Sequence, residues 1–265
     1  MYQFTYHRPD SLSAAVAQLA ADSDAKALAG GQTLLPTMKQ RLAAPSAIVD
    51  LGKIAELAGI SREGDAIVIG AMTRHADVAT SAAVHQAIPA LAALAEGIGD
   101  PQVRNKGTMG GSLANNDPAA DYPAAALALG ATIVTNKREI AADAFFKSLF
   151  ETALEPGEII VKVRFPIPQK AAYVKFPNPA SRYALVGVFV ARNAGGVRVA
   201  VTGAGANGVF RANAIEAALA SNFSASALAG LKIPADGLNS DIHADAAYRA
   251  HLIGVLAKRA VAAAG

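Results

Sequence analysis

The chain has 265 residues, of which 52% are hydrophobic and 17% charged, and its formal net charge is +3 at pH 7. Such a composition belongs to a globular protein with room for more than one subdomain, and the absence of any Lys/Arg run argues against a nucleic-acid surface. The sequence has no cysteine, so it carries neither a disulfide nor a thiolate-ligated iron–sulfur cluster, and any cluster must belong to a partner.

The start of the chain predicts a small βαβ-like unit. Residues 1–9 alternate like a strand and lack the apolar core of a signal peptide. No apolar run reaches the roughly 18 residues of a membrane helix, so we expect a cytoplasmic protein. A helix capped by Asp10 or Ser11 follows, and then short strands at 25–29 and 47–51.

A glycine pair interrupts this unit directly after its second strand. The stretch Ala29-Gly30-Gly31-Gln32-Thr33-Leu34-Leu35-Pro36 has no bulky side chain beside its glycines. Neighbouring backbone N–H groups can therefore turn toward one point and bind an anion such as phosphate. Taken alone, such a segment is more often a turn that ends a strand than a phosphate site.

The next region is expected to be a hairpin followed by helices. Residues 60–62 and 66–69 predict the hairpin, Thr73 is expected to cap the next helix, and residues 88–97 predict an alanine-rich helix. The polar stretch 99–106 has little preference for regular structure and leads into a second glycine segment.

The second glycine segment contains a Gly-Gly pair, as the first does. It reads Gly107-Thr108-Met109-Gly110-Gly111-Ser112-Leu113-Ala114. Together the two segments predict a pair of glycine loops that close on one diphosphate from opposite sides. Asp117 and Asp121 follow, four residues apart, but the proline between them argues against a helical carboxylate pair for acid–base work. We expect Asp117 to cap the turn before Tyr122.

A change of pattern near residues 165–168 predicts a domain boundary, because two prolines two residues apart end a strand. Before it we expect a helix at 122–129 and strands at 131–135 and 159–165. Beyond it we expect a three-stranded antiparallel sheet with strands at 172–176, 184–192 and 197–202. Three helices are expected near 212–220, 224–229 and 244–263. The expected domains are residues 1–55, 56–166 and 170–265.

Residues 203–208 read Gly-Ala-Gly-Ala-Asn-Gly and match the dinucleotide fingerprint G-x-G-x-x-G. That motif requires a helix starting inside it, a returning parallel strand and an acidic residue about twenty positions on. Helical character begins only near Arg211, no apolar strand follows, and Phe223 stands where the acid should be. We interpret the run as a glycine-rich turn.

The histidines are scattered along the chain, at His7, His75, His85, His243 and His251. None pairs with another at the spacing that metal sites favour, so we expect surface or capping residues and no metal site. No nucleophile–base pair is visible either.

With both glycine segments placed, the chain resembles the FAD-binding medium subunits of the molybdenum hydroxylases, the family that contains carbon monoxide dehydrogenase and bacterial xanthine and aldehyde dehydrogenases. The resemblance covers essentially the full length and rests on residues 29–36, 108–114, 117–121 and 156–160. It implies an α+β fold of the vanillyl-alcohol-oxidase type, in which two α+β subdomains clasp FAD. A C-terminal domain of a three-stranded antiparallel sheet with helices would follow.

The resemblance also implies which residues contact the cofactor. The two glycine segments would bind the diphosphate, and Asp121 would approach the ribose or adenine end. Ile98 and Ile160 would make apolar contacts, Lys175 would lie near the flavin, and Tyr183, the candidate catalytic residue, would lie beside the isoalloxazine ring. The full implied set is Ala29, Gly30, Gly31, Gln32, Thr33, Leu34, Ile98, Gly107, Thr108, Met109, Gly110, Gly111, Ser112, Asp117, Asp121, Ile160, Lys175 and Tyr183.

Two positions depart from the family pattern. Thr33 stands where the family usually has Ser, which keeps the hydroxyl. The segment Ser181-Arg182-Tyr183 replaces one that usually has an acidic residue before the aromatic, which affects how the flavin edge is shielded. Without the resemblance, packing within the sheet is the preferred interpretation of Tyr183.

The implied function is that of an oxidoreductase subunit that transfers electrons. A large subunit with a molybdenum cofactor would hydroxylate the substrate, and [2Fe–2S] clusters in a small subunit would pass electrons to FAD in this chain. An external acceptor such as a quinone, oxygen or NAD⁺ would take them. The resemblance leaves open a dimer of such heterotrimers and contact of the complex with the inner face of the cytoplasmic membrane. The alternative is a stand-alone flavin-dependent oxidase of the same fold.

Overall fold

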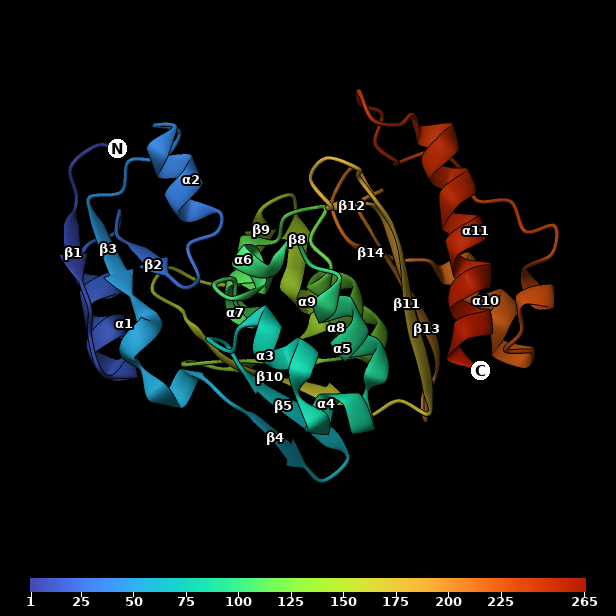
Figure 1. Cartoon of the computed structure of the whole chain (residues 1–265), viewed down its shortest axis with the longest axis horizontal. Coiled ribbons are helices and arrows are strands. Elements are labelled where there is room, and N and C mark those ends of the chain that lie inside the picture. The colour runs from blue at the N-terminus through green and yellow to red at the C-terminus, as the bar shows by residue number, and fades with distance from the viewer.

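The N-terminal unit is a parallel three-stranded sheet with helices, at one end of the molecule in Figure 1. The computed structural model describes residues 1–265. Strands pair in the order β1-β3-β2, both pairs parallel, which confirms the predicted βαβ character. Ser11 caps α1 by accepting a hydrogen bond from the amide of Ala14. The elements are β1 (Thr5–His7), α1 (Leu12–Ala21), β2 (Lys26–Leu28), α2 (Leu34–Lys39), β3 (Ala47–Asp50), η1 (Leu51–Lys53) and η2 (Ala55–Leu57).

The central unit is built on an antiparallel sheet in the order β4-β5-β10-β6-β7. The strands are β4 (Ile60–Glu63), β5 (Ala66–Gly70), β6 (Thr132–Thr135), β7 (Glu139–Ala141) and β10 (Ile160–Pro166), with a separate hairpin of β8 (Phe146–Ser148) and β9 (Glu151–Thr152). The helices are α3 (His75–Thr80), α4 (Ala82–Ala87), α5 (Pro89–Glu96), α6 (Pro101–Arg104), α7 (Met109–Asn115), α8 (Tyr122–Leu129) and α9 (Ala142–Phe145).

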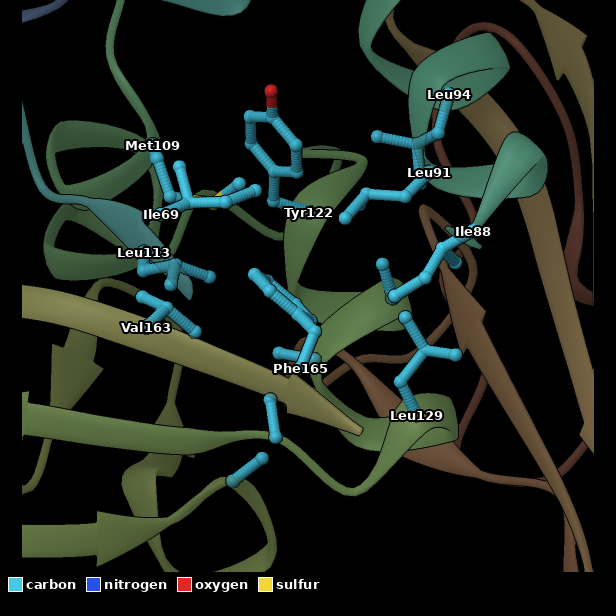
Figure 2. Close-up of a cluster of buried hydrophobic side chains, with 14 of the residues drawn as sticks. Ile69, Ile88, Leu91, Leu94, Met109, Leu113, Tyr122, Leu129, Val163 and Phe165 are labelled. Atoms are coloured by element: carbon cyan, nitrogen blue, oxygen red, sulfur yellow. The ribbon is translucent and has the colours of Figure 1, made fainter. Parts of the chain in front are cut away.

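The largest hydrophobic core lies between this sheet and its helices. Figure 2 shows Phe165 of β10 among apolar side chains from α5 and α8, with Tyr122 beside them. The hydroxyl of Tyr122 points away from these apolar side chains in that view, and it is buried without a hydrogen-bond partner. The core fixes α8, and with it the position of Asp121 at the start of that helix.

The C-terminal unit is an antiparallel sheet covered by helices on both faces. One face packs on α11, and the other packs on α5 and α8 of the central unit, as Figure 1 shows. Because β12 lies between these layers, eight consecutive residues from Ala184 to Ala191 are buried, which explains their continuous apolar run. The elements are β11 (Lys170–Pro177), β12 (Ala184–Asn193), β13 (Gly196–Thr202), β14 (Phe210–Arg211), α10 (Asn213–Ser221), η3 (Ala225–Leu228) and α11 (Ala246–Ala264).

The architecture confirms the predicted fold class and corrects several details. The C-terminal sheet has a fourth strand, β14, which pairs antiparallel with β13. Residues 203–208 form the turn between these strands, so the fingerprint-like run is a glycine-rich turn, as interpreted.

Thr73 does not cap α3: its hydroxyl bonds the backbone of Gly59, and Arg74 is the N-cap residue. The expected domain limits stay a prediction. No helix of the chain combines the length and apolar composition needed to cross a membrane.

Candidate functional site: a cavity between two glycine segments

A cavity of about 570 Å³ lies where both glycine segments meet, and segment 180–183 lines it as well. The two segments touch each other directly. A Cβ atom on Gly30 would lie 2.1 Å from the carbonyl oxygen of Lys106, and one on Gly111 would lie 3.2 Å from the Cβ of Ala29. The convergence expected from the sequence is therefore present in the fold.

The first glycine segment offers a row of free amides. It leaves the end of β2 and turns at Gly31, whose φ of +71° favours glycine. The backbone N–H groups of residues 30–33 make no hydrogen bond within the protein, and these residues line the cavity. Successive unpaired amides in such a turn form a concave donor set suited to an anionic oxygen group.

The second glycine segment differs from the expected loop, because Met109 begins helix α7 and Thr108 is its N-cap. Its amides are largely engaged within the protein. The amide of Met109 donates to Thr73 O at 3.0 Å, that of Gly110 to Ala71 O at 2.8 Å, and that of Gly111 to Thr108 Oγ1 at 3.2 Å. The free amides at the cavity therefore come mainly from the first segment.

Packing within the protein requires the glycines of α7. A Cβ on Gly110 would lie 2.5 Å from the Cβ of Ala71, and one on Gly111 would lie 2.9 Å from Thr108 Oγ1. These distances are far below ordinary contact, so side chains here would push α7 away from the end of β5 or the first glycine segment. The sequence predicts a small pair here so that a phosphate can approach, and packing of the fold is a second reason for the absence of side chains at Gly110 and Gly111.

The walls beyond the glycines are largely apolar. Ile98 and Ile160, both expected from the sequence, line the cavity, and Leu28, Met72, Leu154 and Ile159 do so without having been predicted. Ile98 follows the end of α5, and Ile160 begins β10. Apolar walls with a small number of polar groups are typical of sites for small molecules and cofactors.

Asp121 and Lys175 form a buried ion pair at the edge of the cavity. The carboxylate lines the cavity and lies 3.0 Å from Lys175 Nζ, with side-chain exposures of 5% and 10%. Lys175 also donates to Gly97 O at 2.7 Å, and Tyr173 donates its hydroxyl to Asp121. Burial raises the pKa of Tyr173, so its hydroxyl stays a donor. These hydrogen bonds and the ion pair join β11 to the C-terminal end of α5 and the N-terminal end of α8.

Two residues of the implied set lie away from the cavity surface. Lys175 does not line it and reaches it only through Asp121. Met109 is fully buried in the core and does not line it either. All other residues of the set do line it, including Asp117, whose carboxylate caps a turn by accepting from the amide of Ala119 at 2.9 Å. Their individual contacts with a cofactor stay a prediction.

Tyr183 sits on the loop between β11 and β12 and is 48% exposed. Tyr183 lines this cavity and also a second, smaller one. The loop is held by Asn178, whose Oδ1 accepts from the amides of Ala180 and Ser181, and Arg182 adopts a φ of +62°. Burial, with the nearby carboxylates of Asp117 and Asp121, raises the pKa of Tyr183, so its phenol is protonated at neutral pH.

His75 is the site residue that the sequence pattern misplaced. The sequence predicts a surface or capping residue, but His75 is 5% exposed and lines the cavity beside Gly107. It begins α3, five residues after the buried strand β5 ends at Gly70, and its backbone amide donates to Gly107 O of the second glycine segment at 3.0 Å. Nothing in the local pattern distinguishes it from His85, which is exposed and bonds Ala79 O at 2.7 Å.

A glycine turn with free amides and a cavity of this size with apolar walls are suited to a small-molecule cofactor that carries an anionic oxygen group. The family model described as "FAD binding domain in molybdopterin dehydrogenase" matches residues 2–168. The carbon monoxide dehydrogenase medium chain of Hydrogenophaga pseudoflava is 37% identical, over 99% of this chain and 97% of its own length. The nicotine 6-hydroxylase medium subunit of Paenarthrobacter nicotinovorans is also 37% identical, over 98% and 96%.

A solved structure, reconstituted CO dehydrogenase from Oligotropha carboxidovorans, contains a chain that superposes with a TM-score of 0.90 at 34% identity, covering 99% of this chain and 97% of that one. The chain therefore belongs to the family of FAD-binding medium subunits of the molybdenum hydroxylases, which are oxidoreductases. The cavity fits that cofactor: residues 30–33 present free amides that can bind phosphate oxygens, and the apolar walls suit an isoalloxazine ring.

Proposed function

We propose that this chain is the electron-transferring subunit of a heterotrimeric molybdenum hydroxylase, which takes electrons from the iron–sulfur clusters of a small subunit and passes them through FAD to an external acceptor. The cavity formed by the two contacting glycine segments carries this proposal, together with the match to medium chains along essentially their whole length. Bound FAD supplies the redox chemistry, and the protein binds and orients it.

Different residues of this chain bind and orient FAD. The amides of residues 30–33 hold the diphosphate, and Ile98 and Ile160 enclose the flavin between apolar surfaces. The ion pair of Asp121 with Lys175 fixes the C-terminal sheet against the cavity, so the Tyr183 loop is carried to the flavin side. None of these groups forms a nucleophile–base pair, which agrees with a function in electron transfer.

This chain cannot itself supply thiolate ligands for the proposed iron–sulfur clusters. It has no cysteine, so the thiolates that ligate [2Fe–2S] clusters must come from another subunit. Relatives named for carbon monoxide dehydrogenase and for nicotine 6-hydroxylase align over almost the whole chain. We infer that the hydroxylated substrate is chosen in a large subunit with the molybdenum cofactor, and that two such trimers associate into a dimer.

The decisive experiment is flavin reduction with and without the partner subunits. The purified complex should show flavin absorption bands that bleach when the substrate of the large subunit is added. The isolated chain, reconstituted with FAD, should not bleach with small alcohols or amines. Bleaching of the isolated chain by such a compound would instead establish a stand-alone oxidase, and a chain without any flavin bands would exclude both functions. Gel filtration with light scattering would test the dimer of trimers.

A further inference from the structure

His75 is the one histidine of the chain that is buried in the cavity wall. The side chains of His85, His243 and His251 are exposed and that of His7 is partly exposed, whereas His75 is only 5% exposed. Its ring packs against Tyr122, with ring centroids 5.3 Å apart and the planes tilted by 55°. This packing places the imidazole at the edge of the cavity.

The two ring nitrogens have different surroundings. Nδ1 is fully buried and has no hydrogen-bond partner. Nε2 has no partner within the protein either, but it is not enclosed, and it lies beside Gly107: a Cβ on that glycine would be 2.5 Å from Nε2. Nε2 is therefore the atom that His75 presents to the cavity, next to the second glycine segment.

The ring is uncharged at neutral pH. Burial, helped by the positive charge of Arg104, lowers the pKa of His75 to about 4. The Arg104 guanidinium is itself held by the carbonyl oxygens of Ile98 and Gly99 at 3.0 and 3.3 Å. A neutral imidazole carries one N–H, and a buried donor without an acceptor is rarer than a buried acceptor without a donor. The proton therefore belongs on Nε2.

We propose that His75 is a positioning residue for FAD, which donates a hydrogen bond from Nε2 to an oxygen of the cofactor beside Gly107. This inference rests on the FAD cavity of the proposed function. It explains why Nε2, at the cavity beside Gly107, has no partner within the protein, because an oxygen of the ligand can accept its hydrogen bond. It also explains why residue 107 is glycine, since any side chain there would collide with the donor atom.

The test compares His75→Leu with His75→Gln in the full chain, purified together with its partner subunits. Leu removes the donor, whereas Gln returns an N–H group near the position of Nε2. His85→Leu is the matched control, because His85 lies outside the cavity. Free FAD is removed and then titrated back, and binding is followed by quenching of flavin fluorescence. One lost hydrogen bond corresponds to a dissociation constant raised by about 3- to 10-fold.

We expect His75→Leu to weaken FAD binding by about that factor, His75→Gln to bind within about twofold of the wild type, and His85→Leu to bind as the wild type. Equal affinity of His75→Leu and the wild type would overturn the inference. A His75→Gln chain as weak as His75→Leu would also overturn it, because the histidine would then act by its shape alone. A wild-type chain that binds no FAD would reject the proposed function as well, which separates the two failures.

A second measurement does not depend on how the variants fold. In the wild-type chain labelled with ¹⁵N-histidine, NMR correlations between ring nitrogens and carbon-bound protons identify the tautomer. We expect His75 to carry its proton on Nε2, and we expect that N–H to shift and exchange more slowly when FAD is added. A proton on Nδ1, or a signal that FAD leaves unchanged, would contradict the inference. The His85 ring, which bonds Ala79 O through Nε2, provides an internal reference for this tautomer.

Discussion

The carbonyl oxygen of Lys106 occupies the space that a side chain on Gly30 would need. A Cβ at residue 30 would lie 2.1 Å from that oxygen and 2.7 Å from the Cα of Gly107. Both neighbours are backbone atoms and cannot rotate away. The two glycine segments can therefore touch only while residue 30 has no side chain, and both segments line the cavity.

Replacing Gly30 with Ala is expected to force the two segments apart. Overpacking of this kind typically costs about 1 to 3 kcal/mol, so urea unfolding should show a loss of that size. FAD should be lost on gel filtration, since the free amides of residues 30–33 would move away from the second glycine segment. The matched control is Gly195→Ala, because a Cβ there meets no atom within 4 Å and the glycine is exposed. Retention of FAD by Gly30→Ala would show that the contact is not needed.

Much of this site could be predicted from the sequence, because its main features depend on local chemistry. Glycine pairs and short side chains marked both segments, and the apolar run at 184–192 marked a strand, although its burial on both faces appears only in the fold. The hydrogen-bond acceptor of each backbone amide could not be predicted. Gly110 donates to Ala71 and Met109 to Thr73, partners more than thirty positions away that only the folded sheet brings close.

The burial of His75 could not be predicted either, because it also depends on long-range contacts. A histidine at the start of a helix is commonly a surface residue, and its burial depends on Tyr122 and Gly107, which the fold places against it. The absence of a side chain at Gly107 was visible in the sequence, but the partner that requires this absence was not. Long-range packing, rather than propensity, decides such positions.

The buried pair of Asp121 and Lys175 gives a second prediction. Lys175→Met would leave the Asp121 carboxylate in a buried place without its counter-ion, which typically costs about 3 to 5 kcal/mol. Asp121→Asn in the same chain should recover part of that loss, because the remaining side chain is neutral. Urea unfolding of the two single variants and the double variant forms a double-mutant cycle, and a coupling energy near zero would contradict the predicted interaction.

An exposed ion pair provides the control for that cycle. Lys137 and Glu155 lie 3.1 Å apart with side-chain exposures of 42% and 52%. Solvent screens such pairs, so Lys137→Met is expected to change the unfolding free energy by less than about 1 kcal/mol. An effect as large as that of Lys175→Met would mean that burial does not explain the difference between the pairs.

Glu158 is expected to make the cavity wall sensitive to acid. Its carboxylate accepts hydrogen bonds from Thr135, from Arg138 and from the amide of Glu155. Burial opposes ionisation, but these donors outweigh it and lower the pKa of Glu158 from 4.5 to about 2. The folded pKa lies below the unfolded one, so this contribution to stability is complete above pH 4.5 and is lost as the pH falls toward 2.

The size of the Glu158 contribution is about 1 to 2 kcal/mol, because the partner Arg138 is partly exposed and solvent weakens the pair. Unfolding free energies measured in urea from pH 7 to pH 2.5 should therefore fall more for the wild type than for Glu158→Gln. The variant should be less stable at pH 7, and the two curves should approach each other in acid. Parallel curves across this range would contradict the lowered pKa.

Tyr183 is expected to affect flavin reactivity more than flavin binding. It lies on an exposed loop at the cavity, so its removal should leave the fold intact. We expect Tyr183→Ala to retain FAD within about threefold of the wild-type affinity but to change the rate at which oxygen reoxidises the reduced flavin, because the ring would no longer cover it. The phenol is protonated at neutral pH, so Tyr183→Phe should keep the wild-type rate if the ring alone matters. Stopped-flow absorbance measures both rates, and an unchanged rate in Tyr183→Ala would remove Tyr183 from the site.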